Sequence, residues 1–310
     1  MTHYDLPALN QSFGLPTLNF RSGPTGLALA EIDNPHGRAS LVLQGAHLID
    51  WTPRGAQPVL WLSPKAHFAA GKAIRGGVPI CWPWFGAAAD PALPAHGYAR
   101  TTAWQVTASA ERGDGATQIG LSLPQTAESL ALWPHATPLR LCVTVGETLE
   151  IELVTGNLGA AAVRVGQALH AYFRVGDVRR IALHGLDGRP YWDKTDGGRK
   201  TQAGPVLFTA ETDRIYLDAP GDCLIDDPVL NRRIRVQKRG SASTIVWNPW
   251  AQRAGELADI GADAWPGMVC VESANAAEDV VVIEPGGEHR LWASYGVETL
   301  EGQSSGLGGG

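Results

Sequence analysis

The chain has 310 residues, of which 44% are hydrophobic and 18% are charged. This composition is typical of a folded globular protein and excludes a disordered chain. The 25 Lys and Arg residues against 31 Asp and Glu residues give a formal net charge of −6, and no long basic run occurs. These features exclude a protein that coats nucleic acid through its phosphates, so we expect no nucleic-acid partner.

The N-terminal residues lack the basic and apolar regions of a secretory signal, and no uninterrupted apolar stretch approaches the ~20 residues of a membrane span. We therefore predict a cytoplasmic protein without membrane contact. Four cysteines are spread widely along the chain and form no C-x-x-C pair. This spacing argues against a local zinc or redox motif.

Short strand-like segments separated by turns follow one another along most of the chain. The 37 glycines and 21 prolines are spread over the sequence, which favours many tight turns over long helices. The first predicted strands are residues 27–32, 39–44 and 47–51. Four hairpins are then predicted, from the pairs 104–108 and 118–123, 139–145 and 149–154, 232–237 and 244–247, and 280–283 and 290–293.

Helical periodicity is nearly absent, and we expect only residues 211–216 and 259–265 to hold one or two helical turns each. The lack of strand–helix alternation argues against Rossmann and TIM-barrel folds. We therefore predict an all-β fold, a large antiparallel β-sandwich with few short helices. We expect residues 1–300 to form a single domain and residues 301–310, which are rich in Gly and Ser, to form a flexible tail.

Two segments combine an arginine with glycine and aromatic residues. Arg75 is the only charged residue in 74–86. It belongs either to a rigid core loop from which it extends to solvent, or to an aromatic-walled pocket in which its guanidinium binds an anion. In residues 94–100, His96 and Arg100 indicate a polar site on a loop.

A histidine and a glutamate lie in apolar, strand-like surroundings. If residues 168–174 form one strand, His170 shares a face with Tyr172 and Arg174. Such a histidine is either a satisfied core residue or a catalytic group. Glu272 follows a run of apolar residues, where an ionised carboxylate is costly without partners. It is therefore either paired structurally or retained for chemistry.

Searches for other functional motifs give no support for a metal or a phosphate-binding loop. The sequence contains neither G-x-x-x-x-G-K-[ST] nor H-E-x-x-H, and its nine histidines never lie two or four residues apart. We therefore expect no metal and no cofactor. A G-x-S-x-G match at 302–306 lies in the predicted tail, without the strand and helix of a nucleophile elbow, and is a chance match.

Six segments together resemble the aldose 1-epimerase superfamily, in its glucose-6-phosphate 1-epimerase branch (the hexose-6-phosphate mutarotases). They occur in the family's order within a match from about residue 13 to about residue 295: IRGGVP (74–79), HGYAR (96–100), LHAYF (169–173), ETDR (211–214), VWNPW (246–250) and VESAN (271–275). One departure is Ala95, which stands where the family often has Gln. A polar contact to the sugar is therefore missing or supplied elsewhere.

The resemblance implies a galactose mutarotase-like β-supersandwich, no cofactor, and interconversion of the α and β anomers of a hexose 6-phosphate, with glucose 6-phosphate as the expected substrate. Matched by motif, the family's acid is His170 and its base is Glu272. The resemblance places the phosphate on Arg75 and Arg100 and a further substrate contact on Asp213. We also expect contacts from His96 and from the flat face of a tryptophan, with Trp247, Trp82 and Trp84 as the candidates.

Two other functions stay open at this point. An epimerase for unphosphorylated aldoses needs no arginine pair, and a non-catalytic carbohydrate-binding or sensing protein needs no acid–base pair. Because the sequence contains both Arg75 and Arg100 and both His170 and Glu272, it favours an isomerase acting on a phosphosugar. We expect this small molecule to be its main partner and the chain to be a monomer or weak dimer.

Overall fold

A computed structural model describes residues 4–88 and 90–300, and the predicted tail at 301–310 lies outside them. Two large antiparallel sheets form most of the structure. We name them after their central strands. The β20 sheet contains, in spatial order, β15 (Arg199–Thr201), β14 (Pro190–Asp193), β16 (Thr212–Tyr216), β19 (Ser243–Asn248), β20 (Met268–Asn275), β11 (Gln167–Leu169) and β5 (Ile80–Cys81), with β12 (Tyr172–Arg174) also paired to β20.

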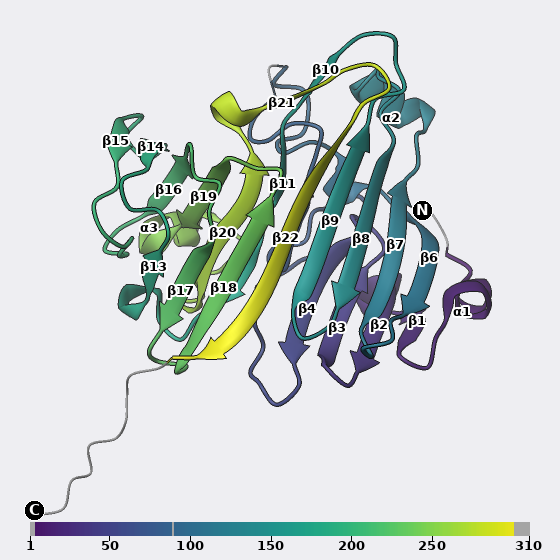
Figure 1. Ribbon diagram of the computed structural model, residues 1–310, viewed down its shortest axis with the longest axis horizontal. Helices are drawn as coiled ribbons and strands as arrows, with labels where there is room; N and C mark the ends of the chain where they lie inside the picture. Colours follow the sequence, from purple (N-terminus) through teal and green to yellow (C-terminus); the bar gives the residue numbers. More distant parts are fainter. Residues whose placement is uncertain (1–3, 89, 301–310) are drawn as a thin grey trace, which may run out of the picture.

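The β22 sheet contains, in spatial order, β13 (Ala182–His184), β17 (Cys223–Asp227), β18 (Arg232–Arg239), β22 (Glu288–Thr299), β9 (Leu149–Gly156), β8 (Leu139–Val145), β7 (Thr117–Leu123) and β6 (Gln105–Glu111). The smaller N-terminal sheet contains β1 (Leu18–Ser22), β2 (Ala28–Asn34), β3 (Gly37–Val42) and β4 (His47–Pro53), while β10 (Val163–Val165) pairs with β21 (Val281–Ile283). In Figure 1 the β22 sheet crosses the picture in front, with β20 behind one half and the N-terminal sheet behind the other. The predicted all-β antiparallel sandwich is confirmed.

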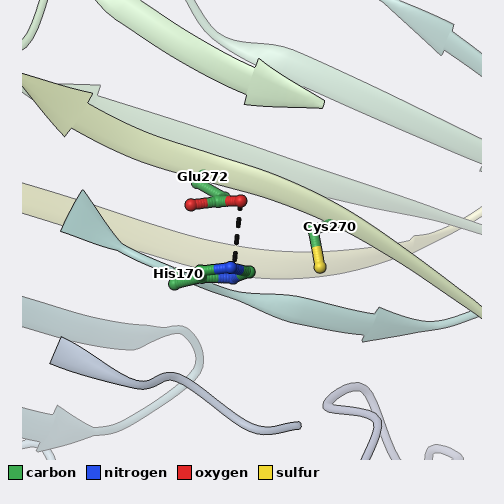
Figure 2. Close-up of side chains that lie close together, drawn as sticks. All are labelled: His170, Cys270 and Glu272. Atoms are coloured by element: carbon green, nitrogen blue, oxygen red, sulfur yellow. Dashed lines mark ion pairs between the residues drawn. The ribbon is translucent and has the colours of Figure 1, made fainter. Parts of the chain in front are cut away.

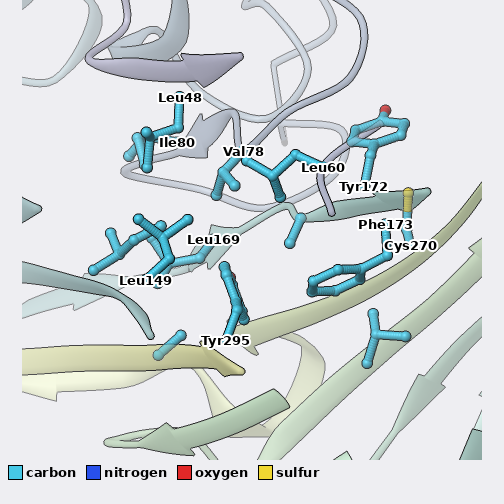
Figure 3. Packing of buried hydrophobic residues seen from close by; sticks show 14 of the residues in the cluster. Leu48, Leu60, Val78, Ile80, Leu149, Leu169, Tyr172, Phe173, Cys270 and Tyr295 are labelled. Carbon is cyan, nitrogen blue, oxygen red and sulfur yellow. The ribbon is translucent and has the colours of Figure 1, made fainter. Parts of the chain in front are cut away.

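The core forms where the sheets pack face to face. Strand β7 alternates buried and half-buried residues, as expected for a strand with one face in the core. Strand β20 differs, because all eight of its residues are buried. Figure 3 shows part of the core beside it, where the rings of Phe173 and Tyr295 meet edge to face at 5.1 Å between centroids. Full burial of each large apolar side chain contributes about 1.5–3 kcal/mol.

Two of the four predicted hairpins are confirmed, because β6 pairs with β7 and β8 pairs with β9. The other two are wrong. Strand β18 pairs with β17 and β22, whereas β19 pairs with β16 and β20, so the turn after β18 carries the chain from one large sheet to the other. Strand β21 pairs with β10, and β22 lies in the β22 sheet. A glycine-containing turn predicts a reversal but does not determine which sheet the next strand joins.

The helices are few and short, as predicted, but most of them lie elsewhere in the chain. Residues 212–216 form β16 instead, whereas the segment expected at 259–265 consists of turns that lead into a 3₁₀ helix at Trp265–Gly267. The described α-helices are α1 (Leu6–Phe13), α2 (Ala127–Leu132) and α3 (Trp250–Glu256). The Asp5 carboxylate caps α1 by accepting a hydrogen bond from the Ala8 N–H at 3.0 Å. None of the helices in the described ranges has the length and apolar character needed to cross a membrane.

Candidate active site

The candidate site is built on β20 and on the neighbouring chain between β11 and β12. Cys270 and Glu272 are two residues apart on β20, so their side chains lie on the same face. Register pairs Leu169 with Ser273 and Tyr172 with Cys270. The two residues between β11 and β12 therefore lie beside Glu272. Figure 2 shows the imidazole of His170 facing the Glu272 carboxylate.

His170 lies in an interruption of the strand, not within a continuous strand as predicted. The ladder stops at β11 and resumes at β12, and the His170 N–H donates to the Pro79 carbonyl at 3.1 Å instead. His170 Nδ1 and Glu272 Oε1 are 3.4 Å apart, an ion-pair distance at which Nδ1 makes no hydrogen bond. Tyr172 shares a face with His170 as expected, and Arg174 at the end of β12 is exposed to solvent.

Aromatic rings fix the orientation of the His170 imidazole. The Tyr172 ring stacks on it with 4.8 Å between centroids and an interplanar angle of 6°. The ring of Trp247, on β19, forms a T-shaped contact with the imidazole, with 6.4 Å between centroids and an interplanar angle of 84°. Trp82, one of the alternatives considered for a sugar-facing ring, is 1% exposed and donates its indole N–H to Thr155 in the core. Of the two, it is Trp247 that lies beside the acid–base pair.

Arg75 is brought to the same place by a turn that only glycine permits. Gly77 has a φ of +62°, and a Cβ there would lie 2.0 Å from the Leu48 carbonyl oxygen. The turn directs the Arg75 side chain to Tyr172, whose hydroxyl accepts a hydrogen bond from Nη1 at 3.0 Å. Nε donates to Asp259 Oδ2, also at 3.0 Å. The Arg75 guanidinium is therefore linked through Tyr172 to the ring that supports His170.

His96 and Arg100 reach the site from the other predicted loop. His96 has a φ of +65°, and its Nδ1 accepts a hydrogen bond from the Gly86 N–H at 3.3 Å. This bond requires that Nδ1 is unprotonated, and burial together with the charges of Arg100, Lys194 and Arg75 lowers the pKa of His96 to about 3. Its ring meets the His170 ring at 5.9 Å. Arg100 Nη2 donates to the Ala95 carbonyl at 2.8 Å.

Asp213 lies on β16 and completes the set of predicted residues. Its Oδ2 is 3.1 Å from Lys194 Nζ, in an ion pair that is partly exposed. The Asp213 carboxylate also raises the pKa of Glu272, after burial, which is the larger cause. The structure therefore brings all seven predicted residues, from six separate elements or loops, to one region around His170 and Glu272.

Burial shifts the two central groups in opposite directions. The pKa of Glu272 is raised well above 4.5, because the carboxylate is buried and because Asp213 repels its charge. The pKa of His170 is lowered well below 6.5, first by burial and then by His96, Arg100 and Arg75. Both shifts favour the uncharged forms of the two groups. A raised pKa makes Glu272 a stronger base once ionised, and a lowered pKa makes His170 a stronger acid once protonated.

Glu272→Gln is expected to stabilise the fold increasingly as pH rises above about 4.5, because burial raises the pKa of Glu272 above this value in the folded state. Above the unfolded-state pKa of Glu272, the unfolded chain loses a proton that the folded state retains, so stability falls until the folded pKa is reached. Glutamine removes this loss. The urea midpoint of both proteins, measured across this pH range, tests the prediction. Glu278→Gln, at an exposed glutamate paired with Arg199, serves as the control, and a gain independent of pH contradicts the prediction.

Four residues of the site were not predicted as functional: Tyr172, Asp259, Lys194 and Cys270. Tyr172 was only placed on the same face as His170. Cys270 had a usable signal, since β-alternation puts it on the Glu272 face. Asp259 and Lys194 follow no pattern, because they are charged residues of connecting segments that meet the site through long-range packing.

Comparisons with known proteins identify the family of this chain. The family described as aldose 1-epimerase matches residues 28–296. An Escherichia coli (strain K12) protein named "Putative glucose-6-phosphate 1-epimerase" is 40% identical over 255 residues, which are 81% of this chain and 84% of that protein. A Salmonella typhimurium (strain LT2) protein of the same name is 37% identical over 276 residues, covering 86% of this chain and 92% of its own.

Solved structures confirm the predicted galactose mutarotase-like fold. The crystal structure described as "a putative mutarotase" from Salmonella typhimurium has a TM-score of 0.86 and 36% identity, over 92% of this chain and 95% of that one. A galactose mutarotase related enzyme from Lactobacillus acidophilus, at 14% identity, shares the fold with a TM-score of 0.70 over 88% of this chain and 98% of its own. The chain belongs to the aldose 1-epimerase family.

Proposed function

We propose that this protein interconverts the α and β anomers of a hexose 6-phosphate, with glucose 6-phosphate as the preferred substrate, by acid–base ring opening and reclosure. The observation that carries the proposal is the pair of His170 and Glu272, which face each other at 3.4 Å in a buried site beside two arginines. The names of the Escherichia coli and Salmonella relatives support the choice of substrate.

In the proposed reaction Glu272, in its ionised form, accepts the proton of the anomeric hydroxyl. His170 donates a proton to the ring oxygen, so the bond between C1 and the ring oxygen breaks and an aldehyde forms. Rotation about the C1–C2 bond exposes the other face of the aldehyde, and reversal of both proton transfers closes the ring. One proton is taken and one is given in each half, so the protein returns to its starting state.

Arg75 and Arg100 are proposed to bind the phosphate. Among the described residues Arg100 has no carboxylate within ion-pair distance, whereas Arg75 is held by Asp259 and Tyr172. An anion bound by such guanidinium groups gains charge-assisted hydrogen bonds. The negative net charge of the protein does not prevent this, because the electrostatic potential at the site depends mainly on the nearby charges. Asp213, His96 and Trp247 are proposed to contact the sugar.

A single anomerisation assay separates this proposal from its alternatives. Pure α-glucose 6-phosphate and pure α-glucose are each mixed with the protein, and polarimetry or NMR follows the approach to anomeric equilibrium against the spontaneous rate. Faster equilibration of the phosphosugar supports the proposal. Equal acceleration of both sugars supports an epimerase for unphosphorylated aldoses, and binding without acceleration supports a carbohydrate-binding protein.

We further propose that the protein acts in the cytoplasm as a monomer or weak dimer. All the proposed catalytic and binding residues come from one chain, so the site needs no second copy. All four cysteines are free, with Cys142 half-buried and the rest buried, as is usual in a reducing compartment.

Tyr172→Phe is expected to raise the KM for glucose 6-phosphate about 10-fold while changing kcat much less. Phenylalanine keeps the ring that stacks on His170 but removes the hydroxyl that accepts from Arg75, a charge-assisted bond of about 1.5 kcal/mol. Steady-state kinetics on the phosphosugar test this. Tyr216→Phe is the matched control, since Tyr216 is a buried tyrosine that accepts from Arg214 away from His170. A fall in kcat at unchanged KM contradicts the role given to the hydroxyl.

A further inference from the structure

One group at the site has no part in the proposed reaction: the thiol of Cys270. Its Sγ, a ring nitrogen of His170 and a carboxylate oxygen of Glu272 all lie within 4.8 Å of one another, and all three residues are buried. Figure 2 shows the thiol and the carboxylate on β20, with the imidazole beside both. The sequence predicted no metal because it offers no local ligand spacing. Here the three groups come together through the pairing of separate strands.

Two atoms of this cluster have no hydrogen-bond partner, although both are buried. They are His170 Nδ1 and Glu272 Oε2. A buried polar atom without a hydrogen-bond partner lowers the stability of the fold. We therefore expect these two atoms to bind a ligand that supplies the missing interaction. The separation of 3.4 Å between His170 Nδ1 and Glu272 Oε1 matches the edge of a tetrahedral zinc site, which is about 3.3 Å for Zn–N and Zn–O bonds of about 2.0–2.1 Å.

We propose that His170, Cys270 and Glu272 form an inhibitory site for a thiophilic divalent cation, with Zn²⁺ as the type. A set of one imidazole, one thiolate and one carboxylate suits Zn²⁺ and Cd²⁺, whereas Mg²⁺ and Ca²⁺ require oxygen ligands. On binding, the Cys270 thiol and the Glu272 carboxyl release their protons to water, and Sγ, a carboxylate oxygen and a ring nitrogen of His170 bond to the cation. A water completes four-coordination.

The cation and the sugar exclude each other in this proposal, which rests on the proposed function for its kinetic part. The cation binds the carboxylate lone pair with which Glu272 would accept a proton. It also binds the ring-nitrogen lone pair on which His170 would carry a proton. The His170 side chain is 10% exposed and the Glu272 side chain only 1%. We therefore expect the cation and the sugar to reach these groups through the same small opening to solvent. The charges of Arg75 and Arg100, which act on His170, oppose a cation. We therefore expect binding in the micromolar range, weaker than in closed structural zinc sites.

Cd²⁺ titration tests the site without any assay of turnover. A cadmium–thiolate bond adds an absorption band in the ultraviolet, and we expect one equivalent of Cd²⁺ to produce it. Because Cys142 is the one cysteine that is not fully buried, the titrations use the Cys142→Ser background. In this background Cys270→Ser abolishes the band, whereas Cys223→Ser, at another buried cysteine outside the site, retains it. If the serine variant is unfolded by near-ultraviolet circular dichroism, Cys270→Ala and His170→Asn replace it.

Inhibition kinetics then test the consequence. Zn²⁺ is expected to raise the apparent KM for glucose 6-phosphate without lowering kcat, EDTA to reverse the effect, and Mg²⁺ to have none. Cys270→Ser is expected to raise the inhibition constant at least 10-fold. A cadmium band that survives loss of Cys270, or inhibition unaffected by it, overturns the proposal. If the protein turns over no phosphosugar, the proposed function fails, while the Cd²⁺ titration still decides whether the metal site exists.

Discussion

Glu272→Gln is expected to lower kcat for the anomerisation of glucose 6-phosphate by about 10²- to 10⁴-fold, the usual contribution of a positioned general base. The glutamine keeps the size and one oxygen of the side chain but cannot accept the proton of the anomeric hydroxyl. Substrate binding is expected to stay within a few-fold of the wild type, because the phosphate contacts are made elsewhere. Polarimetry gives the rate, and isothermal titration calorimetry gives the dissociation constant.

The pH dependence of the wild-type rate supplies an independent readout of the same residue. Since burial raises the pKa of Glu272 above 4.5, the rate is expected to rise with pH over a range above that of an exposed glutamate. This rising limb disappears in Glu272→Gln. Glu278→Gln, at an exposed glutamate, keeps both the rate and the limb. Wild-type turnover by Glu272→Gln would show that Glu272 is structural and that another group is the base.

Arg100→Ala is expected to raise the KM for glucose 6-phosphate about 10- to 150-fold while barely changing any residual activity on glucose. A charge-assisted hydrogen bond to a phosphate contributes about 1.5–3 kcal/mol when partly desolvated, and each ~1.4 kcal/mol is a factor of ten. Arg100 is chosen because, in the described parts of the chain, it is not held by a carboxylate as Arg75 is. Steady-state kinetics on both sugars measure the selectivity.

Two further variants make the Arg100 result specific. Arg100→Lys is expected to restore only part of the affinity, because an ammonium does not present a planar fork to the phosphate. Arg112→Ala, in the turn between β6 and β7, is the control for loss of an exposed positive charge. Equal losses on glucose and glucose 6-phosphate would mean that Arg100 supports the fold, through its bond to the Ala95 carbonyl, and would remove its role in phosphate selection.

The fold was predictable where local pattern alone decides it. Strand β8 has the predicted bounds, and β9 the predicted start, because apolar alternation flanks a short turn and the two strands pair with each other. The partners of β18 and β19 were not predictable, since crossing between sheets depends on how the sheets pack. The helical turns expected at 211–216 failed because pairing with β14 and β19 holds this segment extended.

The sequence predicted which residues lie together at the candidate site, but it did not predict their geometry. Glu272 was visible as a single carboxylate after an apolar run, and its burial at 1% exposure agrees with that reading. The interruption of the strand at His170 was not predictable, because the sequence there alternates as a strand does. Tyr172 stacks on His170 and accepts a hydrogen bond from Arg75. The spacing of these residues in the sequence does not predict either contact.

Because β20 is buried on both faces, its register with the neighbouring strands determines which of its side chains reach the site. Glu272 faces His170 because pairing with β19 on one side and with β11 and β12 on the other sets the register of β20. A slip by one residue exchanges the faces of the strand and brings Val271 or Ser273, depending on its direction, to the site in place of a carboxylate. Insertions in the connection between β19 and β20 are expected to leave this register intact, whereas one within β20 before Glu272 is expected to move the proposed base away from His170. A one-residue insertion in this strand is therefore expected to abolish anomerisation even though no residue of the site is substituted.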